Sequence, residues 1–317
     1  MNFLSKDLLV YRSRYFSAIR SFFKRHGFIE IDTPVLLQEP GQEPYLEPFQ
    51  AFSEGSNETG FLITSPEYSL KQVLATGLPK VYEIAHCFRS GEVGSGIHTP
   101  EFLMLEFYES GKNELELIET CLLLFAYLDE NFHTFGFSSA MVEKIRVPEL
   151  FEQYLGMGDS REELLLCLTN RLPDSHTDWH VMCYEDLFFL VFLNFIEPFL
   201  PDGLLFLYDY PPELAALAKI VDGRAKRFEI YWNRIELANA FWELTDKEEQ
   251  VTRFQQEQQI RKKQGKQIYP INNDFLQTLE MGIPDCAGIA IGLDRLLMAI
   301  LGHVDLQKIS PYFKKLL

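Results

Sequence analysis

Cysteine is scarce in this chain and forms no recognisable pattern. The 317 residues include five cysteines, and none of them belongs to a CxxC pair. Structural zinc sites depend on such close spacing. A zinc module is therefore disfavoured, and the scattered thiols fit a reduced, cytoplasmic compartment. The cysteines are Cys87, Cys121, Cys167, Cys183 and Cys286.

Long hydrophobic runs and an excess of positive charge are also missing. The most apolar stretch, Leu187 to Leu200, is shorter than the ~20 residues that span a bilayer. The formal net charge of −17 argues against general nucleic-acid binding, because phosphate contacts need clustered lysine and arginine, although a local basic patch stays compatible with it. The basic start, residues 1–27, could indicate a transit peptide, but Asp7 interrupts it and we interpret it as a surface helix.

The chain does have enough apolar residues, 47% hydrophobic and 14% aromatic, to bury a large core. Apolar spacing predicts a helix over Leu8–His26 that ends at Gly27, followed by strand-like sequence to Ile31. A strand and then a helix are expected within 288–301. Together these elements indicate an α+β fold. The other expected strands are 61–64, 81–88, 101–108, 204–208, 225–232 and 235–240, and the other expected helices are 66–74, 115–132, 162–168, 185–195 and 247–263.

The two strands 81–88 and 101–108 flank a glycine-rich connection, which predicts a long hairpin loop. Arg89 at its base could hold a phosphate or a carboxylate with two hydrogen bonds. Taken alone, Arg89 could equally form a cross-strand ion pair with Glu106, and His98 could be a solvated loop residue. A hairpin can direct side chains from both strands into one pocket.

Three glutamates, Glu229, Glu236 and Glu243, recur at intervals of seven residues, with Asn239 among them. Such a pattern could be the solvated face of a helix. The intervening residues are too apolar for that and alternate as strands do. Buried carboxylates of this kind need a cation, and their hard oxygens suit Mg²⁺ that carries ATP phosphates.

Glycines cluster from Gly282 to Gly292, on a strand that immediately precedes an apolar helix. Glycine lets the backbone approach a flat ligand closely, and Arg295 at the junction could reach a phosphate. Such a cluster is a weak signal alone, because glycine-rich turns are common.

The order of the motifs along the chain is more specific. Gly27-Phe-Ile-Glu-Ile-Asp-Thr-Pro34, Phe88-Arg89 through Pro100-Glu-Phe102, and Gly292-Leu-Asp-Arg295 resemble motifs 1, 2 and 3 of the class II aminoacyl-tRNA synthetases. The resemblance implies a catalytic core with an antiparallel β-sheet flanked by helices. It also implies that residues 8–34 form a homodimer interface and that motifs 2 and 3 bind ATP.

Three further segments, 64–68, 104–108 and 236–246, are similar to the lysyl-tRNA synthetase active site. By this resemblance Arg89 holds the α-phosphate and the substrate carboxylate, and Arg295 stabilises the γ-phosphate. Both would be catalytic by positioning and charge stabilisation, since the substrate carboxylate attacks the α-phosphorus itself. The resemblance assigns ATP to Arg89, Ser90, Glu92, His98, Thr99, Glu236, Leu237, Gly292 and Arg295, the amino acid to Ser65, Glu67, Glu106, Tyr108, Asn239, Glu243 and Ala290, and Mg²⁺ to Glu229 and Glu236.

An acidic pocket of this kind suits a substrate with two ammonium groups, such as lysine. The segments 43–49, 90–94 and 210–218 are similar to truncated lysyl-tRNA synthetase paralogues that attach lysine or (R)-β-lysine to elongation factor P. Ala290 stands where full-length lysyl synthetases usually have glycine, in agreement with the paralogues. Two departures from the family are a loop, 90–99, that is one residue longer than usual and Thr99 in place of asparagine.

We therefore expect one catalytic domain over 1–317, with a mainly helical insertion at about 113–200 and no anticodon-binding domain. The expected activity is ATP-dependent transfer of lysine or (R)-β-lysine to elongation factor P. Two alternatives stay open: a minimal lysyl-tRNA synthetase-like enzyme with another acceptor, and a non-catalytic paralogue that binds an amino acid. The sequence does not distinguish lysine from (R)-β-lysine as the substrate. It also does not identify the surface that binds the acceptor protein.

Overall fold

A computed structural model of the chain describes residues 4–91, 96–132, 142–173 and 175–311. The fold divides into two compact units. Unit 1 comprises residues 1–136 together with 243–317, and unit 2 comprises residues 137–242. The chain thus leaves unit 1 after its first part and returns to it for its last part.

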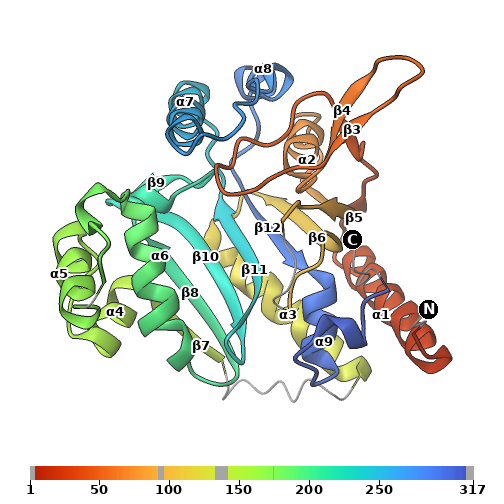
Figure 1. The fold of residues 1–317 in the computed structure, drawn as a ribbon. Helices are drawn as coiled ribbons and strands as arrows, with labels where there is room; N and C mark the ends of the chain where they lie inside the picture. Colours follow the sequence, from red (N-terminus) through yellow and green to blue (C-terminus); the bar gives the residue numbers. More distant parts are fainter. Residues whose placement is uncertain (1–3, 92–95, 133–141, 174, 312–317) are drawn as a thin grey trace. The chain divides into compact units, whose positions relative to one another are not determined.

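The strands of unit 1 lie in the order β1-β5-β6-β12 (Figure 1). All neighbours are antiparallel except β1 and β5, which run parallel. The hairpin β5-β6 is regular over its whole length, so that Val81 pairs with Tyr108 and Glu83 with Glu106. The strands are β1 (Ile29–Glu30), β5 (Lys80–Phe88), β6 (Glu101–Ser110) and β12 (Cys286–Gly292).

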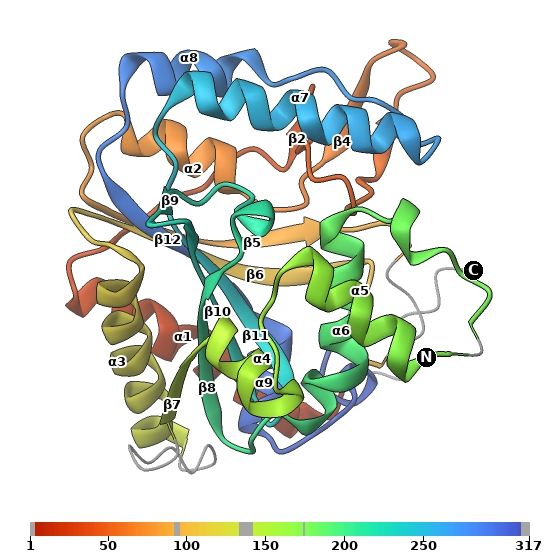
Figure 2. The ribbon, with the colours of Figure 1, turned by 90° about the vertical axis from the view of Figure 1, so that its left-hand side faces the viewer.

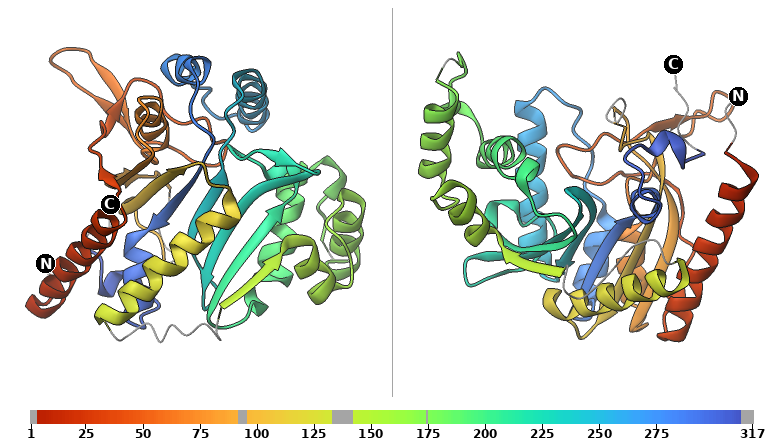
Figure 3. Two further views of the ribbon diagram at one scale, coloured as in Figure 1. Left: turned by 180° about the vertical axis from the view of Figure 1, so that it is seen from behind. Right: turned by 90° about the horizontal axis from the view of Figure 1, so that it is seen from below.

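The helices of unit 1 form two groups around these strands. Figure 1 shows α9 in front of β6 and β12, and the rear view in Figure 3 shows α3 in front of them. α2, α7 and α8 gather at one end of the strands, where α8 contacts both of the others (Figure 2). The helices are α1 (Lys6–Arg25), α2 (Glu67–Leu74), α3 (Glu114–Phe132), α7 (Lys247–Lys263), α8 (Asn273–Met281) and α9 (Leu293–Ile300).

Helix α1 has a clear start, a clear end and one buried face. The Ser5 side chain accepts a hydrogen bond from the Leu8 amide at the N-terminus. Gly27 follows with φ of +79°, a conformation that favours glycine and ends the helix. The buried face includes Phe22 and Phe23, and the Phe23 ring stacks on Tyr82 of β5 at 4.4 Å between centroids.

A buried ion pair fixes α9 relative to α1. Arg12 Nη1 lies 2.9 Å from Asp294 Oδ1, and the other Asp294 oxygen accepts a hydrogen bond from the Leu103 amide at 2.9 Å. Tyr15 also donates to the Leu293 carbonyl. Asp294 therefore serves the fold, and it holds the start of α9 against β6.

A second small sheet in unit 1 has the order β2-β4-β3 and is antiparallel. Its strands are β2 (Leu36–Leu37), β3 (Gln50–Phe52) and β4 (Thr59–Leu62). The loop between β2 and β3 is fastened to α7 by Arg261, whose side chain is fully buried. Arg261 donates to the carbonyls of Glu43 and Leu46 and pairs with the Glu47 carboxylate at 3.0 Å.

The strands of unit 2 lie in the order β11-β10-β8-β7, with β9 beside β10. Only β7 and β8 run parallel. A register shift between Ile230 and Tyr231 interrupts the pairing of β10 with β11. The strands are β7 (Val142–Arg146), β8 (Leu204–Tyr210), β9 (Ile220–Val221), β10 (Arg224–Trp232) and β11 (Ile235–Trp242).

Three helices of unit 2 pack on these strands and form its apolar core (Figure 3). Phe151 of α4 and Phe192 of α6 both contact Phe188, at ring distances of 5.2 and 5.9 Å. Leu205 and Leu207 of β8 belong to the same cluster. The helices are α4 (Val147–Leu155), α5 (Arg161–Arg171) and α6 (Tyr184–Phe195).

The expectation of mainly antiparallel strands flanked by helices is confirmed, and each helix and strand predicted from apolar spacing is present within a few residues. The short strands β2, β3, β7 and β9 and the helices α4 and α8 were not foreseen. Within the expected insertion 113–200, α3 belongs to unit 1 and residues 142–200 to unit 2. Its role as an insertion stays a prediction.

No helix within the described part of the chain is long and apolar enough to cross a membrane.

Candidate active site

The core of the candidate site in unit 1 is built by the pairing of β6 with β12. Side chains of a strand alternate between its faces, so Glu106 and Tyr108 lie on one face of β6. In the register with β12, Tyr108 is opposite Gly288 and Glu106 is opposite Ala290. Three residues predicted to bind the amino acid are thereby neighbours.

Two more predicted residues, Glu67 and Glu243, are joined by a lysine. The ammonium of Lys71 lies 2.7 Å from Glu67 Oε1 and 2.6 Å from Glu243 Oε2. Lys71 is fully buried, and Glu243 is only 1% exposed. Glu67 and Lys71 are four residues apart on α2 and therefore share one face of that helix.

The charge of Lys71 is stable in this place. Burial disfavours a charged ammonium, but Glu243 and Glu67 outweigh it and raise the pKa of Lys71 above its ordinary value. Its Nζ atom also lies 5.8 Å from the centre of the Phe275 ring on α8. Lys71 is therefore a permanent cation enclosed by carboxylates and an aromatic ring.

Glu106 is the buried carboxyl group with the strongest reason to be neutral. Burial raises its pKa well above the ordinary value, and the nearby charge of Glu67 adds to this. Tyr108 donates a hydrogen bond to Glu106 Oε1 at 2.5 Å, while Oε2 is buried without a hydrogen-bond partner among the described residues. A buried acceptor of this kind is costly unless a donor reaches it, so the site is prepared for one.

Gly288 leaves just enough space for these side chains. A Cβ atom at this position would overlap the Tyr108 ring and lie 2.6 Å from Glu243 Oε1. Glycine is needed here for close approach and not for backbone conformation. At Gly288 the close neighbours are the side chains of Tyr108 and Glu243, and the predicted approach of Gly282–Gly292 to a flat ligand stays a prediction.

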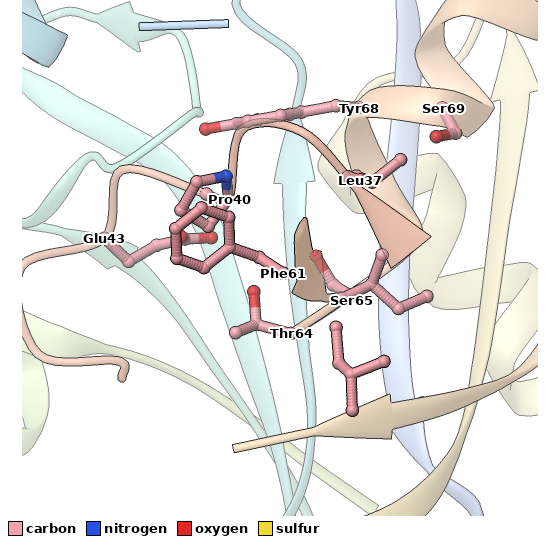
Figure 4. Close-up of a pocket in the computed structure, with 11 residues that line it drawn as sticks. Leu37, Pro40, Glu43, Phe61, Thr64, Ser65, Tyr68 and Ser69 are labelled. Atoms are coloured by element: carbon pink, nitrogen blue, oxygen red, sulfur yellow. The ribbon is translucent and has the colours of Figure 1, made fainter. Parts of the chain in front are cut away.

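A pocket opens beside α2, lined by Ser65, Tyr68 and residues of the small sheet (Figure 4). Glu43, Phe61 and Thr64 also line it. Burial raises the pKa of Glu43, and Glu67 raises it further. Ser65, predicted to bind the amino acid, thus lines a pocket that also contains Glu43. Glu43 is close enough to Glu67 and Lys71 for their charges to affect it.

The predicted ATP residues of the hairpin lie at its loop end. Arg89 donates from Nε to the Thr64 carbonyl at 3.4 Å, and its guanidinium group lies 5.1 Å from the centre of the Phe102 ring. The Ser90 amide donates to the Glu47 carbonyl, and the buried Thr99 hydroxyl donates to the Glu101 carbonyl. His98 is half-buried. Glu92 lies outside the described residues.

Gly292 and Arg295 occupy the junction of β12 and α9, as predicted. Gly292 caps α9 and pairs with Met104 of β6. Arg295 is half-buried and donates from Nε to the Ile97 carbonyl at 3.2 Å, which links α9 to the hairpin loop.

The other predicted residues lie in unit 2, where Glu229 of β10 is opposite Asn239 of β11. Both oxygens of Glu229 accept hydrogen bonds, one from Arg227 Nη2 and one from the Tyr231 hydroxyl at 2.6 Å. Arg227 Nε donates to Asn239 Oδ1 at 3.0 Å. The cation that the buried carboxylate requires is therefore supplied by Arg227.

A third carboxyl group approaches this cluster from the segment after α6. Burial raises the pKa of Glu197 to about 7, and the charges of Glu236 and Glu229 contribute. Leu237, also predicted to contact ATP, is buried next to Glu236 on β11. Unit 2 thus carries an acidic cluster of its own.

The predicted Mg²⁺ ligands Glu229 and Glu236 lie in the acidic cluster of unit 2. The two carboxylate oxygens of Glu229 accept hydrogen bonds from Arg227 and Tyr231. Among the described residues, no group of three or more His, Cys, Asp or Glu side chains is placed to hold a metal ion. In this conformation each Glu229 oxygen accepts a hydrogen bond from a protein group, and the role of Glu229 as a Mg²⁺ ligand stays a prediction.

The structure thus brings together Glu67, Glu106, Tyr108, Glu243 and Ala290 in unit 1, and Glu229, Glu236 and Asn239 in unit 2. Their roles stay predictions. Sequence reasoning missed Lys71, Glu43 and Arg227. The spacing of four residues between Glu67 and Lys71 on an expected helix was an available signal for the first of them.

Comparisons with known proteins agree over nearly the whole chain. Residues 2–315 match the family described as tRNA synthetases class II (D, K and N). A curated relative from Yersinia enterocolitica, named elongation factor P--(R)-beta-lysine ligase, is 34% identical in an alignment 314 residues long that covers 96% of this chain and 94% of the relative. Relatives of the same name from Yersinia pestis and Yersinia pseudotuberculosis are 35% identical with the same coverage.

The close approach at Gly288 gives a first testable prediction. The change Gly288→Ala should lower the free energy of unfolding by about 1–3 kcal/mol, because the added methyl group overpacks the site against Tyr108. Urea unfolding followed by circular dichroism measures this. Gly55→Ala is the matched control, because nothing lies within 4 Å of its added Cβ. Equal stability of the two variants would contradict the packing argument.

The raised pKa of Glu197 predicts a pH dependence of stability. For an acid whose pKa is raised by folding, the folded state binds the proton more tightly, so stability is lost as the pH rises from about 4.5 to about 7. With a discount for partial exposure we expect a loss of about 1–2 kcal/mol. The change Glu197→Gln should remove it, so the advantage of the variant over the wild type grows from pH 5 to pH 8.

Urea unfolding at four pH values between 5 and 8 tests this expectation. The exposed Glu152 of α4 provides the control, and Glu152→Gln should follow the wild-type profile. Parallel profiles for Glu197→Gln and the wild type would rule out the proposed ionisation of Glu197.

Proposed function

Because the chain belongs to the class II tRNA synthetase family (D, K and N), we propose that it activates lysine or (R)-β-lysine with ATP and transfers it to elongation factor P. The acceptor and the β-amino acid come from the name that the Yersinia relatives share. A cytoplasmic location is part of the same proposal.

The observation that carries this proposal is the cluster of acidic side chains around Tyr108. Glu67, Glu106 and Glu243 converge there, with a single buried lysine among them. A carboxylate in a buried place requires a cation or a proton. A substrate with two ammonium groups would supply the cations, whereas a neutral or acidic amino acid would leave the carboxylates uncompensated.

The first half-reaction requires positioning more than a catalytic nucleophile. A carboxylate oxygen of the amino acid attacks the α-phosphorus of ATP, the bond from that phosphorus to the bridging oxygen breaks, and pyrophosphate leaves with the electron pair. We assign to Arg89 the α-phosphate and the carboxylate, and to Arg295 the γ-phosphate, since fixed cations stabilise the charge that develops on these oxygens. Gly292, Ser90 and Thr99 would contact the nucleotide nearby.

In the second half-reaction the neutral ε-amino nitrogen of an acceptor lysine attacks the carbonyl carbon of the adenylate. An amide bond forms, the bond to the phosphate oxygen of AMP breaks, and the amine loses a proton to solvent. Mg²⁺ enters this scheme with ATP as part of the substrate. Glu236 and Glu229 stay proposed contacts of that ion, and each Glu229 oxygen also accepts a hydrogen bond from a protein group.

We also propose that residues 8–34 form a homodimer interface. The segment and its continuation expose several large apolar side chains, including Leu9 at 50%, Ile29 at 44% and Leu36 at 57%. Large exposed apolar side chains are typical of an interface where they form one patch.

Purified protein tests the proposal in two steps. The first is pyrophosphate exchange dependent on lysine or on (R)-β-lysine, and the second is transfer of the labelled amino acid to elongation factor P or to tRNA. Labelled elongation factor P would support the proposal. Labelled tRNA would support a minimal lysyl-tRNA synthetase-like activity. A chain that catalyses no exchange with any amino acid would be a binding paralogue.

The pocket argument also predicts a difference between the two substrates. The change Glu243→Ala should raise the KM for lysine by about 30-fold or more, because it removes a charged partner of an ammonium group. Binding of ATP should change by less than about 3-fold, since ATP offers no ammonium group to this residue. Lysine-dependent exchange and calorimetric titration with ATP measure the two effects.

Glu248→Ala removes an exposed carboxylate from the first turn of α7 and serves as the control, with both values expected at wild-type level. Equal losses for lysine and ATP in Glu243→Ala would contradict the assigned role.

A further inference from the structure

We propose that Lys71 is a positioning residue for the amino acid, a built-in counterion that keeps Glu67 and Glu243 ionised and in place before the substrate arrives. This inference rests on the proposed function and adds a residue that no sequence motif singled out. It concerns the ground state of the pocket and not a chemical step.

The enclosure of Lys71 supports the inference. Its ammonium contacts Glu67 from its own helix and Glu243 from the segment after β11, at 2.7 and 2.6 Å. Glu43 and Glu106 are near enough for their charges and that of Lys71 to influence one another. The groups that face Lys71 are thus Glu43, Glu67, Glu106, Glu243, the Tyr108 hydroxyl beside Glu106, and the Phe275 ring.

Fold stability alone gives no reason for this arrangement. A buried ion pair recovers little more than its desolvation cost, and apolar side chains of similar size often stabilise a core better. Several carboxylates in one enclosed place also cannot all ionise without cations. One lysine among them leaves a net acidic site in which two carboxylates are already charged.

Charged carboxylates are what a substrate ammonium needs. Each carboxylate has about four lone-pair positions, so Glu67 and Glu243 can hold Lys71 and a second ammonium group at the same time. Without Lys71 the two glutamates would lie close together with no cation between them. Crowded carboxylates that lack a cation favour protonation, so Lys71 prepares the site for a diamine.

The change Lys71→Met, which keeps the size of the side chain and removes its charge, tests this directly. The KM for lysine in pyrophosphate exchange should rise by about 30-fold or more at pH 7. The loss should shrink toward pH 9, because crowded carboxylates that lack a cation favour protonation, and a rise in pH opposes it. The wild-type KM should change less over this range, and the KM for ATP should stay within about 3-fold.

Chemical rescue provides a second measurement that a merely structural role would not produce. The change Lys71→Ala removes three carbons and the ammonium, which are the atoms of propylammonium. Addition of propylammonium should lower the KM for lysine in Lys71→Ala, whereas 1-propanol at the same concentration and ionic strength should not. In the wild type, propylammonium should act only as a weak competitor of lysine.

Lys112→Ala is the matched control. Lys112 also bridges to a buried glutamate, Glu109, at 3.0 Å, but Glu109 lies on the opposite face of β6 from Glu106 and Tyr108. This variant should lose stability with an unchanged KM for lysine and no rescue.

The outcomes separate the inference from the proposed function. The role of Lys71 alone would be overturned if the wild type catalyses exchange but the folded Lys71→Met variant has an unchanged or pH-independent KM for lysine. A failure of propylammonium to rescue Lys71→Ala would also overturn it. A wild-type chain that activates no amino acid would overturn both. A rise in the KM for lysine that falls with pH and is reversed by propylammonium would support both.

Discussion

Charge enclosed in an apolar interior is the constraint on which this structure depends. In unit 1 the Lys71 ammonium joins α2 to the segment after β11 through two carboxylates that the rest of the fold keeps from water. An uncompensated ion in such a place would cost several kcal/mol. The positions of α2, of the Glu243 segment and of Gly288 are therefore tied to one another, because each is needed for the ions to meet without exposure.

Unit 2 meets the same constraint with arginine. Arg227 lies on β10 two residues from Glu229 and therefore on the same face of the strand, where it pairs with that carboxylate and reaches Asn239. Its guanidinium group lies 4.7 Å from the centre of the Tyr210 ring, so an aromatic face shields the cation. A planar group with several donors can satisfy two acceptors at once, which a lysine in that place could not do with the same geometry.

Buried arginines also fasten segments that lack an apolar face. Helix α7 has little apolar surface, and Phe254 is its fully buried hydrophobic residue. Arg261 at its end binds the carbonyls of the loop 43–46 and the Glu47 carboxylate, so hydrogen bonds replace apolar packing there. The same loop carries Glu43 into the pocket beside α2. The Arg12–Asp294 pair also connects α1 to α9, in addition to the apolar packing of these two helices.

The sequence by itself determined the long elements, the family and the set of acidic residues, because apolar periodicity and motif order are local properties that survive without coordinates. It placed α1, the hairpin β5-β6 and the strand-to-helix junction at Gly292 within a few residues. Only the tertiary structure decided how the buried charges are compensated. That Lys71 meets Glu243 from a distant part of the chain, that Glu229 is taken by Arg227 and Tyr231, and that Gly288 faces Tyr108 depend on register and packing between separate segments. A carboxylate in a sequence does not show its partner, because the partner is chosen by proximity in space.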